Sequence, residues 1–134
     1  MVKEKIFKLI MMTTKKVFVF DIDDTIITRP EGLNHLGLDK YNYCTPMVDN
    51  IKIVNDLYDS GHEIILYTAR GMFVLKGDVE NVYDALYDLT VQQLKDFNVK
   101  YHKLLLGKLF YDYWVDDKAI NVNDLKSFID GFEQ

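Results

Sequence analysis

The sequence has a single cysteine, Cys44, and only three histidines among its 134 residues. One cysteine cannot form an intramolecular disulfide, so nothing in the sequence indicates an oxidising compartment. His35, His62 and His102 are scattered singly, and with one cysteine they form no zinc-binding pattern. The sequence therefore supports neither a disulfide-stapled fold nor a zinc protein.

Long hydrophobic runs are also missing. The apolar run near the N-terminus, residues 9–12, is too short to span a bilayer, and no small-residue cleavage site follows it. We therefore expect no association with a membrane and, by default, a cytoplasmic protein. Residues 1–15 are predicted to form an N-terminal extension or an additional edge element.

Positive charge is scarce as well, because 16 Lys and Arg residues face 21 Asp and Glu residues, for a net charge of -5. This balance argues against a general polyanion binder, so a nucleic-acid partner is disfavoured, although a local basic patch would still permit one. The chain also lacks repeats and low-complexity tracts. Its length suits one domain with a sizeable core, and we predict a single domain over residues 1–134.

What is present is organised around residues 17–26, which read VFVFDIDDTI. Four β-branched or aromatic residues without polar alternation indicate a strand covered on both faces, as in a parallel α/β sheet. Such sheets bind ligands beyond the carboxyl ends of their strands. Asp21 and Asp23 are two residues apart, so in extended chain they face the same side, whereas Asp24 faces elsewhere. Two close carboxylates repel unless a cation or a proton lies between them.

Three further apolar runs end in polar residues. In chain order, these polar residues are Thr68 and Arg70, with Ala69 between them, after residues 63–67, Lys108 after residues 103–106, and Asp116 and Asp117 after residues 113–115. A hydroxyl at a strand end, and backbone N–H groups just past it, donate hydrogen bonds to anionic ligands. Arg70 either clamps a phosphate or carboxylate or pairs with a surface acid, and the sequence leaves both open.

Apolar residues at helical spacing predict helices between these strands. Helices are expected over residues 46–60, 79–86, 90–97 and from about 121 to 128. Thr45 followed by Pro46 marks the start of the first, and the capping-box pattern of Thr90 and Gln93 marks a separate start for the third. Asn121 or Asn123 is a candidate cap for the last.

Strands that alternate with helices predict an α/β fold with a mainly parallel sheet, which would gather the polar strand ends along one edge. The acids there would hold a hard divalent cation, and Mg²⁺ is the metal that such sites usually take together with a substrate phosphate. Thr68 and Lys108 would hold the phosphate oxygens. The lysine would also offset the charge of the crowded carboxylates.

Four motifs together resemble those of the haloacid dehalogenase (HAD) superfamily of phosphotransferases, over residues 17–128. They are DIDDT at residues 21–25, ILYT ending at Thr68, GK at residues 107–108 and VDD at residues 115–117. The resemblance implies a three-layer Rossmann-like fold with a mainly parallel central sheet and helices on both faces. It also implies a magnesium-dependent phosphatase.

The resemblance assigns roles to individual residues. Asp21 would be the nucleophile that forms an aspartyl-phosphate, and Asp23 the general acid that protonates the leaving group and then activates water. Mg²⁺ would be held by the Asp21 carboxylate, the Asp23 main-chain carbonyl and Asp116, with Asp117 as a second ligand or an outer acid. The acid at position 23 favours phosphate ester hydrolysis over the other reactions of the superfamily.

Thr68 and Lys108 would bind the phosphate and neutralise charge. The further candidates for contact with the substrate phosphate are Thr25, Ala69 and Arg70. The phrases YTARGM and GK...VDDKA are similar to those of small proteins labelled as capsule or lipopolysaccharide biosynthesis phosphatases, which hints at a sugar phosphate. Those relatives usually have proline where this chain has Leu109, so the loop next to Lys108 differs in stiffness.

The sequence leaves little room for a cap domain. Residues 27–45 are predicted to form a flap or loop and residues 71–89 an insert near the site, and neither is long enough for a separate domain. Members of the superfamily without a cap have open sites that accept large substrates, or they close the site by oligomerising. A homo-oligomer is therefore an open expectation.

Three rival interpretations stay open. A polynucleotide-end phosphatase shares the same active-site plan, but the acidic balance of the chain disfavours it. A catalytically idle HAD-fold module would bind phosphorylated ligands without turnover. A phosphorylation-dependent receiver domain also places acids, Thr and Lys at strand ends, yet there the acidic pair comes early, whereas here a second pair follows Lys108.

Overall fold

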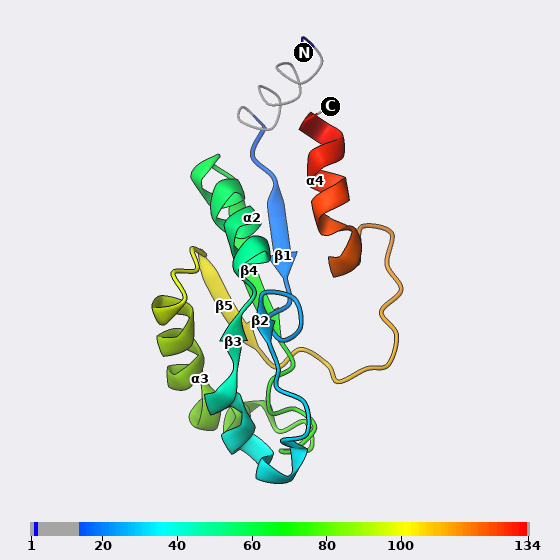
Figure 1. Ribbon diagram of the computed structural model, residues 1–134. Coiled ribbons are helices and arrows are strands. Elements are labelled where there is room, and N and C mark those ends of the chain that lie inside the picture. The colour runs from blue at the N-terminus through cyan, green and yellow to red at the C-terminus, as the bar shows by residue number, and fades with distance from the viewer. Residues whose placement is uncertain (1, 3–13, 134) are drawn as a thin grey trace.

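The structure is a computed structural model that describes residue 2 and residues 14–133 (Figure 1). Most of the predicted N-terminal extension, residues 1–15, lies outside the described residues. No helix in the described part of the chain is long and apolar enough to cross a membrane.

The centre of the fold is a three-stranded parallel sheet in the order β1-β4-β5. Its strands are β1 (Val17–Phe20), β4 (Glu63–Thr68) and β5 (Lys103–Leu106). The three apolar runs predicted as strands at these positions are confirmed, and so is the α/β class with a parallel sheet. All three strands point the same way, so their carboxyl ends lie at one edge.

The two faces of the sheet differ in burial. On one face Phe20, Leu66 and Leu104 lie side by side in the registers of the two strand pairs, and all three are buried. Helices α2 (Val48–Asp59) and α3 (Val79–Asp96) contribute the other side of this core. On the opposite face Val17 and Val19 are 58% and 60% exposed. Among the described residues, therefore, helices bury one face of the sheet, and a complete second layer on the other face is not seen.

Helix α2 begins later than predicted. Thr45 and Pro46 form β3 (Thr45–Pro46), which pairs antiparallel with β2 (Ile27–Thr28), and the helix cap is Met47. The residue before a proline is pushed towards extended backbone, and here a strand partner is available for it. The Thr-Pro pair therefore closes a small ribbon instead of opening the helix.

The prediction of two helices in residues 79–97 is wrong, because α3 is one continuous helix of 18 residues. Asp78 caps it by accepting a hydrogen bond from the Asn81 N–H at 3.2 Å. Thr90 and Gln93, whose spacing matches a capping box, are both buried inside the C-terminal half of the helix. Residues three apart share a helix face, so this spacing also suits a pair that points inward.

Residues 27–45 carry the two short strands β2 and β3 and the 3-10 helical segment η1 (Asn34–Tyr43). The segment predicted as a flap or loop thus contains short elements of its own. Tyr41, near the end of η1, is buried. Its hydroxyl accepts a hydrogen bond from the Gly71 N–H at 3.0 Å. The segment is thereby fixed to the loop that follows β4.

The fourth predicted strand, residues 113–115, is absent from the structure. After β5 the chain runs in an extended, non-strand path, and every residue from 109 to 120 is exposed. Figure 1 shows this segment bowing away from the sheet before it returns to η2 (Val122–Asp124) and α4 (Leu125–Glu133) beside β1. The predicted last helix is confirmed, with the Asn121 side chain accepting from the Asn123 N–H at its start.

Candidate functional site

Asp21 and Lys108 meet at the carboxyl edge of the sheet. Asp21 directly follows β1, and Lys108 lies two residues past β5. The Lys108 Nζ atom is 3.8 Å from Asp21 Oδ1, and the two side chains are 12% and 33% exposed. The parallel sheet thus brings together an acid and a base that are 87 positions apart in the sequence, as was predicted from their places at strand ends.

The loop that carries Lys108 is held in place from two sides. Its main-chain N–H donates to the Thr68 carbonyl at the end of β4, at 3.1 Å. Gly107 has φ = 90°, and a Cβ there would lie 2.9 Å from a methyl group of Val79 at the start of α3. Only glycine tolerates both this backbone conformation and this close approach. These contacts fix the backbone of the loop in the position from which the Lys108 side chain reaches Asp21.

Burial raises the pKa of Asp21 above its ordinary value of 3.8. Removal of water disfavours the charged form of a carboxyl group, and this is the largest effect at Asp21. The positive charge of Lys108 acts in the opposite direction, while the negative charges of Asp23 and Asp24 raise the pKa further. A cation or an electrophile beside Asp21 would therefore stabilise its charged form.

Asp23 is held by Arg70. The Arg70 guanidinium donates from Nε to both carboxylate oxygens, at 3.1 and 3.0 Å, and from its terminal nitrogen to Oδ1 at 3.0 Å. The Asp23 side chain is only 12% exposed and that of Arg70 is fully buried. Such multiple charge-assisted bonds fix the carboxylate in one orientation beside Asp21.

Arg70 also donates to side chains of α3. Its other terminal nitrogen donates to Thr90 Oγ1 at 3.2 Å and to Gln93 Oε1 at 2.8 Å, and the Tyr41 ring lies 5.0 Å from its charge centre. The Arg70 side chain is therefore bound inside the protein. The sequence leaves open whether Arg70 binds an anionic ligand or pairs with an acid, and the structure shows that it pairs with an acid. That acid is Asp23, whose side chain is mostly buried, and not a surface residue.

Sequence reasoning missed the part that α3 and the flap play at the site. Thr90 and Gln93 receive the far end of Arg70, and the Gln93 amide donates in turn to the Tyr41 carbonyl. Their spacing was visible in the sequence, but it was interpreted as a helix start. A buried arginine needs acceptors from several elements, and a single sequence does not show which elements surround it.

Thr68 and Thr25 have local structural partners. The Thr68 side chain is fully buried, and its hydroxyl oxygen accepts from the Arg70 N–H at 3.1 Å, which shapes the turn through Ala69. Thr25 lies in the turn after Asp23, where its carbonyl accepts from the Asn50 side chain at 2.8 Å. Neither contact uses the hydroxyl proton, so both hydroxyl groups keep a donor for a ligand.

Asp116 and Asp117 are not brought to this edge. Both lie on the exposed segment of residues 109–120, and the Asp116 carboxylate accepts a local hydrogen bond from the Lys118 N–H at 3.2 Å. Within the described residues, no three His, Cys, Asp or Glu side chains lie close enough together to hold a metal ion. The acids predicted to bind Mg²⁺ are all present in the chain, but Asp116 and Asp117 do not join Asp21 and Asp23 in one cluster.

Aromatic rings surround Lys108 on its open side. The rings of Tyr111 and Trp114 lie 4.9 and 5.2 Å from Nζ, and the Tyr111 hydroxyl is 3.0 Å from it. The rings of Phe73 and Phe110 contact each other with centres 5.1 Å apart and planes tilted by 41°, and both side chains are mostly exposed. Exposed aromatic side chains thus lie next to the one cation of the site.

The fold is known from a solved structure. No protein-family model and no curated protein sequence matches the chain. A crystal structure of a Vibrio cholerae protein superposes with a TM-score of 0.72 and 23% sequence identity, over 90% of this chain and 98% of the other. At that identity the likeness concerns the fold alone.

Proposed function

We propose that this protein is a phosphomonoester hydrolase of the haloacid dehalogenase type, built on the three-layer fold of that superfamily and working through an aspartyl-phosphate. The observation that carries the proposal is the meeting of Asp21 and Lys108 at the sheet edge, with Asp23 fixed beside them by Arg70. A nucleophile, a proton-transfer group and a cation are the parts that such a reaction needs.

The reaction would run in two balanced steps. A carboxylate oxygen of Asp21 forms a bond to phosphorus while the ester P–O bond breaks, and Asp23 gives a proton to the leaving oxygen. Water then attacks the phosphorus of the aspartyl-phosphate, Asp23 takes its proton, and Asp21 and inorganic phosphate are released.

The other groups of the site stabilise charge and hold geometry. Lys108 would face the phosphate oxygens and offset the negative charge that meets there, and the Thr68 hydroxyl would donate to one of them. Mg²⁺, the metal that such sites usually take, would supply further positive charge at the phosphate. Arg70 is a positioning residue, because all its contacts hold Asp23 and the surrounding helix.

The substrate is proposed to be a small phosphorylated metabolite with a ring, such as a sugar phosphate. Exposed aromatic faces next to Lys108 suit a ring that stacks while its phosphate reaches the cation. Nucleobases stack in the same way, so a polynucleotide 3′-end is the second candidate, and the net charge of -5 opposes it. A panel of sugar phosphates, nucleotides and 3′-phosphorylated oligonucleotides separates the two.

The activity is tested first by hydrolysis of p-nitrophenyl phosphate with Mg²⁺. We expect turnover by the wild type and a loss on the order of 10³-fold or more in Asp21→Asn, because the nucleophile is removed. Asp24→Asn is the matched control. Asp24 belongs to the same motif, but its carboxylate pairs with Arg29 at the surface, so this variant keeps most of the activity.

Two outcomes would contradict the proposal. One is undiminished turnover in Asp21→Asn, which would remove the nucleophile from its role. The other is a wild type that binds a phosphorylated sugar, measured by calorimetry, but hydrolyses none of the panel, which would favour a binding module.

A further inference from the structure

Lys108 carries an ammonium group that is mostly buried and has unused donors. Its side chain is 12% exposed, and the acceptor that the described residues offer to Nζ is the Tyr111 hydroxyl oxygen, at 3.0 Å. Asp21 Oδ1, at 3.8 Å, attracts the charge but lies beyond hydrogen-bond distance. An ammonium group has three donors, so two of them have no acceptor within the described part of the chain. An anion that supplies these acceptors would stabilise the buried cation.

The Tyr111 hydroxyl has an unused donor at the same point. Its oxygen accepts from Lys108 Nζ, and an ammonium group has no lone pair, so the hydroxyl proton cannot bond back to the lysine. No other residue that the structure describes accepts this proton. The N–H groups of Lys108 and the O–H group of Tyr111 are therefore adjacent donors for one anionic group, such as a phosphate.

Trp114 places a flat apolar surface next to these donors. Its ring lies 5.2 Å from Lys108 Nζ and 5.1 Å from the Tyr111 ring, with the two ring planes at 60°. The residue is 47% exposed and is not part of the hydrophobic core. A ring stacked on an indole has its centre about 4.5–7 Å from the indole centre. One small molecule can therefore place a phosphate at Lys108 and a ring on Trp114.

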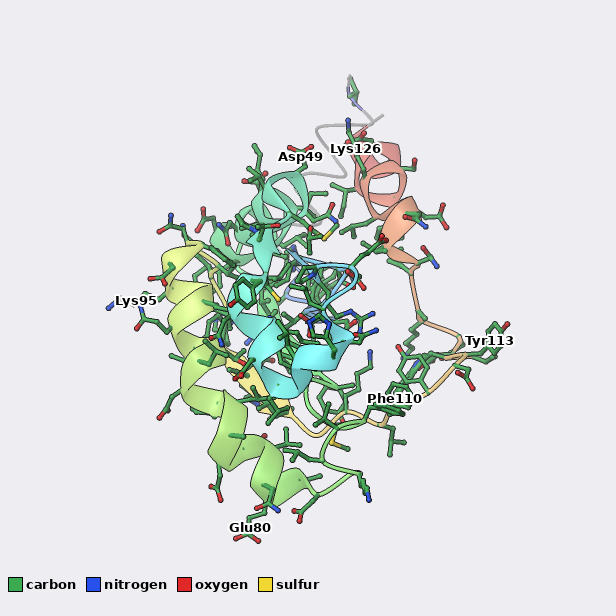
Figure 2. The ribbon with its side chains drawn as sticks, turned by 60° about the horizontal axis from the view of Figure 1, so that its bottom comes forward. Asp49, Glu80, Lys95, Phe110, Tyr113 and Lys126 are labelled. Atoms are coloured by element: carbon green, nitrogen blue, oxygen red, sulfur yellow. The ribbon has the colours of Figure 1, made fainter. Side chains whose placement is uncertain are left out.

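Tyr113 lies on the same segment and is placed differently. It is 90% exposed, and Figure 2 shows it pointing away from the body of the molecule. Tyr111 and Trp114 instead place their rings beside Lys108. The segment thus contains two aromatic residues that contact the cation and one that projects into solvent, and this third residue provides an internal control.

We propose that Tyr111 and Trp114 recognise a phosphate carried next to a ring: the Tyr111 hydroxyl donates to the phosphate that Lys108 binds, and the Trp114 indole stacks on the ring. The inference rests on the proposed function only in that Lys108 binds the substrate phosphate. Trp114 selects ring-bearing phosphate monoesters over acyclic ones, whereas Tyr111 contributes to the binding of both. Sugar rings and nucleobases both present a face to an indole, so the recognised chemistry is a ring with a phosphate.

The position of the ring is tested by fluorescence, because Trp114 is the only tryptophan of the chain. The full chain with Asp21→Asn, which cannot form an aspartyl-phosphate, is titrated with glucose 6-phosphate, adenosine 5′-monophosphate and glycerol 3-phosphate. We expect the two ring-bearing esters to change the emission of Trp114 and the tighter of them to bind about tenfold more tightly than glycerol 3-phosphate. The tighter ester identifies the kind of ring. No change in emission with either ring-bearing ester would overturn the proposal.

Calorimetry of variants in the same Asp21→Asn background separates the two contacts. Trp114→Leu is expected to lower the preference for the ring-bearing ester over glycerol 3-phosphate about tenfold. Tyr111→Phe keeps the ring but removes a hydrogen bond to a charged group, so it should weaken the binding of both esters and of inorganic phosphate about tenfold. Tyr113→Leu and Tyr113→Phe are the matched controls and leave these affinities unchanged.

Two results of the calorimetry would overturn the inference. One is an equal loss of affinity for ring-bearing and acyclic esters in Trp114→Leu, and the other is an unchanged affinity for phosphate in Tyr111→Phe. The proposed function fails in a different way. A wild type that hydrolyses none of the three esters, with the expected binding pattern, would refute the hydrolase and support the recognition of the ring. A wild type that hydrolyses ring-bearing and acyclic esters with equal kcat/KM would support the hydrolase and overturn the recognition.

Discussion

The chain has two acidic pairs that look alike in sequence and differ in structure. Asp21 and Asp23 follow β1, which is hydrogen-bonded to β4 and packed on the core, and both acids acquire fixed neighbours. Asp116 and Asp117 follow an equally apolar run, but residues 113–115 have no strand beside them and stay exposed. An apolar run becomes a strand only where a neighbour completes its hydrogen bonds, and the residues beyond it gain a defined environment only then.

The sharpest test of the difference between packed and exposed parts compares two arginines, each paired with an aspartate of the DIDD motif. Arg70→Met is expected to lower the free energy of unfolding by about 3–5 kcal/mol, because it leaves the buried Asp23, Thr90 and Gln93 without their partner. Arg29→Met breaks a pair that is about half exposed, and is expected to cost about 0–1 kcal/mol. Urea unfolding followed by circular dichroism, at one protein concentration, measures both.

Equal losses of unfolding free energy in Arg70→Met and Arg29→Met would contradict this argument. They would mean that burial of the guanidinium adds nothing to the cost of removing it. A large loss in Arg70→Met that Arg70→Lys fully restores would also contradict the argument, because a lysine cannot reproduce the bonds to three separate partners.

Glycines with positive φ give a second test. Gly107→Ala is expected to cost about 2 kcal/mol, because the new methyl group meets Val79 at 2.9 Å and the backbone conformation is strained. Gly32→Ala has similar strain, at φ = 76°, but open space around it, so about 1 kcal/mol is expected. Thermal unfolding measures both, and Val79→Ala should recover part of the loss only in the Gly107 variant.

The smallest expected effect concerns pH and His62, which is buried against Phe18. Burial, with a further contribution from Lys16, lowers the pKa of His62 below its ordinary value of 6.5. As the pH falls through 6.5, the unfolded chain takes up a proton before the folded chain does, so stability decreases until the pH drops below the lowered pKa. The loss of stability on acidification should be smaller in His62→Gln than in the wild type.

The control for the pH test is His35→Gln, since His35 lies exposed on η1. Its dependence of melting temperature on pH should match that of the wild type. If His62→Gln instead follows the wild-type profile, the acid sensitivity arises elsewhere in the fold.

Much of the fold could be predicted from local patterns. The apolar runs of β1, β4 and β5 are continuous and end in turn residues, and the stripe of α2 repeats at helical spacing. Errors arose where one pattern serves two structures. Thr90 and Gln93 fit a helix start as well as an inward-facing pair, and Pro46 fits a helix start as well as a short strand. Only the residues packed around them decide between the two.

The sequence by itself determined the chemistry that this protein carries: which strand ends bear acids, hydroxyl groups and a lysine, and that parallel strands would place them at one edge. The tertiary structure alone decided which of these groups meet. Arg70 became an internal partner of Asp23 because α3 and the flap surround it with acceptors, and Asp116 stayed apart from Asp21 because no neighbouring strand holds its segment. Local composition specifies the groups, but their contacts depend on packing between distant parts of the chain, which a single sequence does not encode in any local pattern.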